Sequence, residues 1–96
     1  MKKEDKIAVI TGGARGIGLS IAEQLVREGL HVVIADIQIE IAEQVVQDLG
    51  NSATAKKLDV TKADEVQKVF TDIAKEKKPI DILVNNAGIT RDALLI

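Results

Sequence analysis

The stretch Ile7–Gly18, IAVITGGARGIG, predicts a strand, a tight turn and a helix with no spacer between them. Its first four residues, 7–10, form an apolar run that is too short for a helix and does not alternate, as expected of a parallel strand covered on both faces. Gly12, Gly16 and Gly18 follow at GxxxGxG spacing. We expect Gly12 to take a positive φ in the turn, Gly16 to leave room for a pyrophosphate, and Gly18 to let the helix pack close to the sheet.

The start of this helix is a candidate site for nucleotide phosphates. The amides of a first helical turn lack partners within the helix and lie at the positive end of its dipole. A glycine-rich corner that binds nothing is the alternative, because glycines at this spacing are a weak signal by themselves. The strand before the motif, the helix after it and an acidic residue downstream favour the nucleotide site.

The acidic residue is Asp36, which follows a second apolar run, 31–35. It stands about 20 residues after the glycines, where a ribose-binding carboxylate belongs. An ionised carboxylate accepts hydrogen bonds from the ribose hydroxyls and repels a 2′-phosphate, which favours NAD. Arg15 favours NADP, since a guanidinium in the turn could reach that phosphate. We give Asp36 more weight because it lies at the ribose. Its alternative role is to cap the next helix.

The rest of the chain alternates between helical and strand patterns. A first helix is expected at 17–28 and ends at Gly29. A second contains Ile41, Val45 and Leu49 and ends at Gly50, and a third is N-capped by Thr61 and closes at 76–78. Two further strands are expected at 53–58 and 80–84. Such alternation predicts an α/β fold, a Rossmann-like parallel sheet of about four strands with helices on both faces. We interpret residues 1–96 as a single dinucleotide-binding half-domain.

The composition excludes several kinds of function. With 46% hydrophobic and 29% charged residues, the chain is typical of a soluble globular protein. Its net charge is −2 and Phe70 is its only aromatic residue, so nucleic-acid binding by base stacking is unsupported. The chain has no cysteine and only His31 as histidine, which argues against disulfides, thiolate catalysis and a metal site. No apolar run is long enough to span a membrane and the lead-in MKKEDK contains no signal sequence, so we expect a cytoplasmic protein.

Four motifs in this order resemble the N-terminal part of the short-chain dehydrogenases/reductases. They are TGGARGIG at 11–18, Asp36 after the second strand, LDV at 58–60 and NNAG at 85–88. The continuation ITRD at 89–92 resembles the β-ketoacyl-carrier-protein reductases of that family. The resemblance implies the strand order 3-2-1-4, cut short after the fourth strand.

The same resemblance implies the role of each motif. Asp59 would accept a hydrogen bond from the adenine amino group and the Val60 backbone would frame that ring, although both could belong to a simple β-to-α connection. Ile37 would lie against the adenine and Ile17 against the pyrophosphate. The segment 85–88 would pass beside the ribose and the nicotinamide, tied to the glycine turn by the Thr11 hydroxyl. The cofactor-binding residues expected are therefore Gly12, Arg15, Gly16, Ile17, Gly18, Asp36, Ile37, Asp59, Val60, Asn86, Ala87 and Gly88.

The catalytic residues of the family cannot be assigned to this chain. Hydride transfer to a carbonyl needs a proton donor, which in the family is a Tyr-x-x-x-Lys pair with a Ser and an upstream Asn. The chain contains no tyrosine, and its serines, Ser20 and Ser52, fall in the first helix and in a helix-to-strand loop. We therefore expect no catalytic residue and no activity from the chain alone.

Three functional readings stay open. The first is an NAD(H)-binding module of an oxidoreductase that moves hydride between nicotinamide and a carbonyl or alcohol. The second is a minimal folding unit with a vestigial nucleotide site, which self-associates through the open edge of the fourth strand. The third is a half-fold that a partner chain completes.

Overall fold

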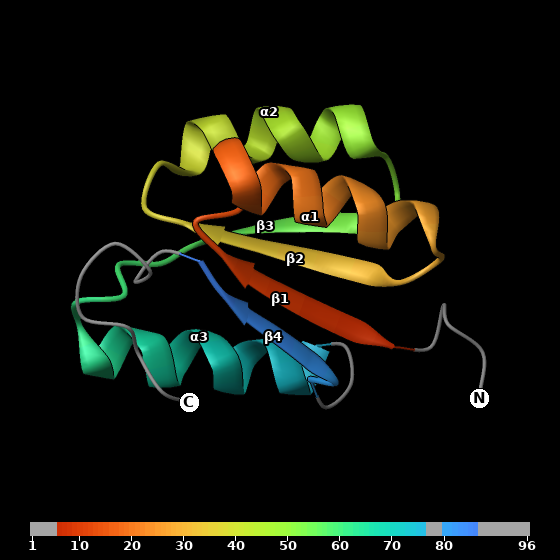
Figure 1. The fold of residues 1–96 in the computed structure, drawn as a ribbon. Coiled ribbons are helices and arrows are strands. Elements are labelled where there is room, and N and C mark those ends of the chain that lie inside the picture. Colours follow the sequence, from red (N-terminus) through yellow and green to blue (C-terminus); the bar gives the residue numbers. More distant parts are fainter. Residues whose placement is uncertain (1–5, 77–79, 87–96) are drawn as a thin grey trace.

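The computed structural model describes residues 6–76 and 80–86, and these form one parallel sheet with helices on both faces (Figure 1). The strands are β1 (Ile7–Thr11), β2 (His31–Asp36), β3 (Ala53–Lys57) and β4 (Ile82–Asn85). The helices are α1 (Gly16–Arg27), α2 (Ile39–Leu49) and α3 (Ala63–Glu76). None of these helices is long and apolar enough to cross a membrane.

The sheet has the strand order β3-β2-β1-β4 with every neighbouring pair parallel, so the predicted order is confirmed. In register, Val9 of β1 lies between Val33 of β2 and Leu83 of β4. At one end of β4 the Ile7 amide donates to the Asp81 carboxylate and the Asp81 amide donates to the Ile7 carbonyl, each at 2.9 Å. This pair fixes β4 against β1.

The two central strands are buried on both faces, which explains their unbroken apolar sequences. Ala8, Ile10, Val32 and Ile34 pack toward α1 and α2, whereas Ile7, Val9, Val33 and Ala35 pack toward α3. Alternate residues of a strand point to opposite faces, so a strand covered on both sides needs apolar residues throughout. Figure 1 shows α1 and α2 on one side of the sheet and α3 on the other.

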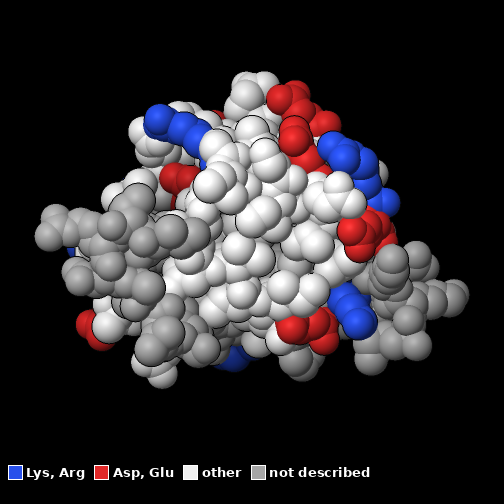
Figure 2. All heavy atoms as spheres, viewed as in Figure 1, with Lys and Arg blue, Asp and Glu red and all other residues white. Residues whose placement is uncertain are grey.

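Charged side chains are unevenly distributed over the surface. Figure 2 shows them toward the rim, while the middle of this face, over β1 and β4, carries none. All four residues of β4 are only half-buried. The described residues thus leave an uncharged face beside the last strand of the sheet.

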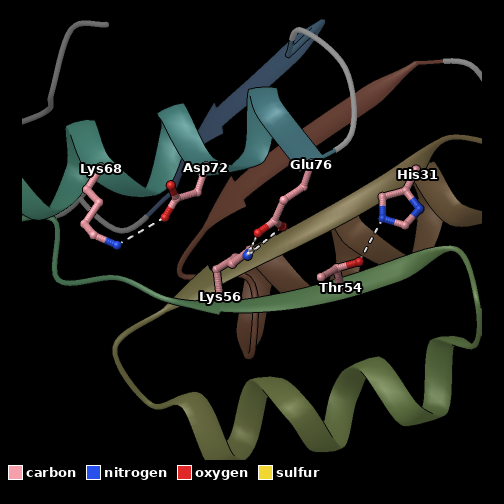
Figure 3. Close-up of polar contacts among 6 residues, drawn as sticks. All are labelled: His31, Thr54, Lys56, Lys68, Asp72 and Glu76. Carbon is pink, nitrogen blue, oxygen red and sulfur yellow. Dashed lines mark hydrogen bonds and ion pairs between the residues drawn. The ribbon is translucent and has the colours of Figure 1, made fainter.

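The opposite edge strand, β3, is polar where it faces α3. The Thr54 hydroxyl lies 2.9 Å from His31 Nε2 on β2, and Lys56 Nζ lies 2.8 Å from Glu76 Oε1 at the end of α3 (Figure 3). Lys68 and Asp72 form a second ion pair along α3. Charged side chains on an edge strand discourage pairing with another chain, so this edge differs from that of β4.

Three boundaries differ from the predicted ones in ways that matter. Helix α3 begins at Ala63, and Thr61 donates its hydroxyl to Asp59 instead of accepting a helix amide, so the prediction of Thr61 as N-cap is wrong. Strand β4 spans Ile82–Asn85, so it begins two residues later and ends one residue later than predicted. Strand β3 ends at Lys57, one residue before the predicted end. The predicted helix end at 77–78 and the motif at 89–92 lie outside the described residues.

Candidate functional site

The glycine turn joins β1 to α1 through residues that need the left-handed region. Gly12 has φ 66° and Gly16 has φ 57°, values that L side chains rarely adopt, and the prediction for Gly12 is confirmed. The Gly12 amide donates to the Ala35 carbonyl at 2.8 Å, which joins the turn to the end of β2. A Cβ atom at Gly16 would meet nothing within 4 Å. The space beside Gly16 is therefore open.

Gly18 lets the start of α1 come very close to the carboxyl ends of the strands. A Cβ atom there would lie 2.5 Å from the Gly12 carbonyl oxygen and 2.7 Å from Asn86 Nδ2. The start of α1 thus lies against the residues that directly follow β1 and β4, so the close approach to the sheet is made at the carboxyl ends of these strands. Asn86 in turn donates to the Gly12 carbonyl at 3.1 Å.

The first turn of α1 has features of an anion site. Its N-cap residue, Arg15, has extended backbone angles, φ −148° and ψ 164°, and makes no side-chain capping hydrogen bond. The turn contains no acidic residue. Because the partial positive charge of a helix start attracts anions, these amides can accommodate a phosphate.

Asp36 joins the glycine turn to the loop after β2. Its Oδ2 accepts a hydrogen bond from the Ala14 amide at 3.2 Å, and its Oδ1 accepts one from the Gln38 amide at 2.9 Å. The N-cap of α2 is Gln38, so the alternative role of Asp36 as the cap residue itself is wrong. Each carboxylate oxygen has a second lone pair, so the group can accept further hydrogen bonds.

A hollow of about 240 Å³ lies at the carboxyl ends of the strands. Five predicted site residues line it together with Leu58, which the sequence analysis did not select: Gly12, Asp36, Ile37, Asp59 and Val60. Leu58 is 2% exposed and forms the floor of the site as part of the core under α3. Its place in the LDV motif was a signal that could have identified it.

Asp59 is held by the turn that leads into α3. The hydroxyl of Thr61 donates to Asp59 Oδ1 at 2.6 Å and its amide donates to the same oxygen at 3.0 Å. These two bonds hold the pKa of the Asp59 carboxyl below its ordinary value of 3.8, against a smaller effect of desolvation and with a minor contribution from Lys62. The Asp59 amide donates to Glu65 Oε1 at 3.0 Å, which fixes the turn to the first part of α3.

The end of β4 is tied to the glycine turn by two residues. The Thr11 hydroxyl, on a side chain that is 1% exposed, lies 3.1 Å from Asn85 Oδ1, which confirms its predicted link to this segment. Asn86 holds the Gly12 carbonyl, as described above. Ala87 and Gly88 lie outside the described residues.

The remaining predicted residues flank the turn. Ile17 is 69% exposed and Ile37 is 55% exposed, and they are the exposed large hydrophobic residues of the described chain. Arg15 is exposed too, and its Nη2 donates to Gln38 Oε1. Within 6–76 and 80–86, no three histidine or acidic side chains group as a metal site would require.

The comparisons with known proteins agree with this geometry. Residues 6–95 match the family model described as short chain dehydrogenase. The chain is 44% identical over 92 residues to an uncharacterized oxidoreductase of Mycobacterium bovis and 43% identical over 96 residues to a 3-oxoacyl-(acyl-carrier-protein) reductase of Salmonella typhimurium. It covers 37% and 39% of these two relatives, which cover 94% and 100% of it.

A solved structure shows the same fold. The 3-ketoacyl-(acyl-carrier-protein) reductase from Brucella melitensis, complexed with NADH, superposes with a TM-score of 0.77 at 32% identity. The match covers 81% of this chain and 32% of the reductase. The chain therefore spans well under half the length of the proteins that it resembles.

Replacing Gly18 by alanine is expected to destabilise the fold by about 3 kcal/mol, because the new methyl group would overlap the Gly12 carbonyl and force the backbone apart. Gly16→Ala is the matched control, with open space around the methyl group but a positive φ, and should cost about 1 kcal/mol. Urea unfolding measures both. Equal stability of Gly18→Ala and the parent chain would contradict the close approach.

The Asp59 carboxyl is expected to titrate below 3.8 in an NMR experiment, and Thr61→Val should raise its pKa toward 3.8 by removing the hydroxyl donor. A pKa lowered by folding stabilises the native state above the unfolded value, and this contribution is lost as the pH falls through the folded value. The destabilisation caused by Thr61→Val should therefore be present at pH 7 and vanish in strong acid. Thr71→Val, on the exposed side of α3, should leave Asp59 unchanged.

Proposed function

The chain belongs to the short-chain dehydrogenase family, and from this premise we propose that it is the NAD(H)-binding part of an oxidoreductase that moves hydride between nicotinamide and a carbonyl or alcohol. One observation carries the proposal. The glycine turn, Asp36 and the segment 58–60 come from distant parts of the sequence and line one hollow at the carboxyl ends of the strands, where ligands of such sheets bind.

The diphosphate would lie at the start of α1. Support comes from the open space beside Gly16 and from a first turn without acidic residues or a side-chain cap. Ile17, exposed in that turn, would be covered by the bound dinucleotide. Burying an apolar side chain that is otherwise in water favours the complex.

The adenosine would occupy the hollow. Ile37 and Val60 would supply apolar surface for the adenine, and the Asp59 carboxylate would accept a hydrogen bond from the adenine amino group. The ribose hydroxyls would donate to the free lone pairs of Asp36, whose orientation is already set by the Ala14 and Gln38 amides. A 2′-phosphate would stand beside this negative charge, so NAD is the cofactor proposed and NADP is disfavoured.

The proposal covers cofactor binding and not catalysis by these 96 residues alone. The sequence contains no tyrosine, so the proton donor of the family is not supplied by this chain. Hydrogen bonds of Thr11, Asn85 and Asn86 hold the end of β4 beside the glycine turn. That segment would form the nicotinamide side of the site.

A second candidate is self-association through β4, favoured by its half-buried residues and the uncharged face around it (Figure 2). The occupant would be a second copy of this chain, whose β4 pairs antiparallel across a two-fold axis. In this reading the two sheets join into one, and the nucleotide site is not required for assembly.

Titration of the purified chain with NADH and NADPH, followed by nicotinamide fluorescence or calorimetry, tests the first proposal. NADH is expected to bind about tenfold more tightly than NADPH. In NADPH the 2′-phosphate replaces a ribose hydroxyl that would donate a hydrogen bond to Asp36, and the carboxylate repels the phosphate. If neither dinucleotide binds, the proposal that the chain is a cofactor-binding module is refuted. A preference for NADPH would refute the role given to Asp36.

Asp36→Asn should weaken the binding of NADH about tenfold and reduce the difference between the affinities for NADH and NADPH. The asparagine side chain keeps one acceptor oxygen but carries no charge. Asp48→Asn changes the net charge equally on the exposed end of α2 and serves as the control. Its affinities for both dinucleotides should match those of the parent chain.

Sedimentation over a wide concentration range tests the second candidate. A concentration-dependent dimer is expected, and added salt should not weaken it because the contact surface is uncharged. A clean monomer at high concentration would rule out the β4 dimer.

A further inference from the structure

The backbone of Asp59, which lines the hollow, is held by hydrogen bonds on both sides. Its carbonyl accepts a hydrogen bond from the Lys62 amide at 3.0 Å, and its amide donates to Glu65 Oε1 at 3.0 Å. The preceding amide, that of Leu58, donates to the Asp36 carbonyl on β2 at 3.1 Å. Successive amides of an extended chain point in opposite directions, so the Asp59 amide points away from β2 and needs another acceptor, which Glu65 supplies.

Glu65 reaches further back along the chain than an ordinary helix cap. It is the third residue of α3, and a glutamate at this position commonly accepts the amide of the residue before the helix. That amide belongs to Lys62 and is already bound to the Asp59 carbonyl. The half-buried Glu65 side chain instead reaches past Lys62 to the Asp59 amide. Helix α3 thus fixes the turn that connects it to β3.

The same turn orients the Asp59 carboxylate and leaves one of its oxygens for a ligand. The Thr61 amide and hydroxyl both donate to Oδ1, at 3.0 and 2.6 Å. Among residues 6–76 and 80–86, these are the hydrogen bonds that the carboxylate accepts, so Oδ2 keeps its lone pairs. An ionised carboxylate is an acceptor only, which suits the amino group of adenine and opposes the carbonyl oxygen of a 6-oxopurine.

We propose that Glu65 is a positioning residue for adenine recognition, which sets the backbone of Asp59 so that its free oxygen faces the base. This inference rests on the proposed dinucleotide-binding function and deepens it. Within the described chain, Glu65 is not among the residues that line the hollow, so it acts on the base through Asp59. Without the Glu65 acceptor, the Asp59 amide would be unpaired and the turn would shift to bring it to water.

The test measures the ratio of two dissociation constants, that of reduced nicotinamide hypoxanthine dinucleotide to that of NADH. In the analogue an oxygen replaces the adenine amino group. The parent chain is expected to prefer NADH about tenfold, because the analogue lacks the donor to the Asp59 carboxylate. In Glu65→Ala the ratio should fall about threefold, since Asp59 is no longer held in place. A general loss of structure would weaken the binding of both ligands equally and leave the ratio unchanged.

Three further variants isolate the hydrogen bond. Glu65→Gln keeps a side-chain oxygen that can accept the Asp59 amide, so it should retain the ratio of the parent chain. Asp64→Ala removes the same charge from the same first turn of α3, at an exposed residue, and should also retain it. In an Asp59→Ala background, Glu65→Ala should have no effect on the ratio, because no carboxylate remains to be oriented.

The outcomes separate this inference from the function on which it rests. A parent chain that binds neither ligand overturns both. A parent chain that binds the two ligands equally overturns the adenine contact of Asp59 and the role of Glu65 with it. A preference for NADH that is unchanged in Glu65→Ala overturns the role of Glu65 alone. An equal fall of the ratio in Glu65→Gln or Asp64→Ala also overturns it, because the charge and not the hydrogen bond would then be the cause.

Discussion

The close approach of the start of α1 to the Gly12 carbonyl and Asn86 is the constraint on which the site depends. Gly18 allows it, since any side chain there would lie within 3 Å of both groups. The approach brings three segments together: the end of β1, the first turn of α1 and the residue after β4. Asn86 then satisfies the Gly12 carbonyl with a hydrogen bond, which buried backbone groups require. The missing side chain therefore sets the geometry of the turn and links it to the far strand.

Backbone amides and the Thr61 hydroxyl orient the carboxylates of the proposed site in the ligand-free chain. Asp36 receives hydrogen bonds from Ala14 and Gln38, and Asp59 receives two from Thr61. Such bonds restrict the side-chain rotamers, so less conformational entropy is lost on binding. The same bonds hold the loops after β2 and β3 in place. Stability of the loops and readiness for a dinucleotide thus share one set of contacts.

Several features could be predicted from local sequence because they follow from local rules. The apolar runs of β1 and β2 are buried on both faces, and Gly12 takes the positive φ that a sharp turn needs. Gly50, with φ 91°, ends α2 as expected. Thr61 is not the N-cap, although a threonine before a helix is a common one, because Asp59, two residues earlier, accepts its hydroxyl and amide hydrogens in a local turn.

The sequence by itself determined the parallel α/β fold and the glycine turn, because periodicity and spacing record which faces are buried and where the backbone must turn. The family was indicated by the resemblance of four motifs. The strand order, expected from the resemblance, is the order observed. Only the tertiary structure decided which groups meet. It placed Gly18 against Gly12 and Asn86, and it made Leu58 part of the lining of the hollow. These contacts join segments separated by long stretches of chain, and their geometry depends on the packing of the whole sheet.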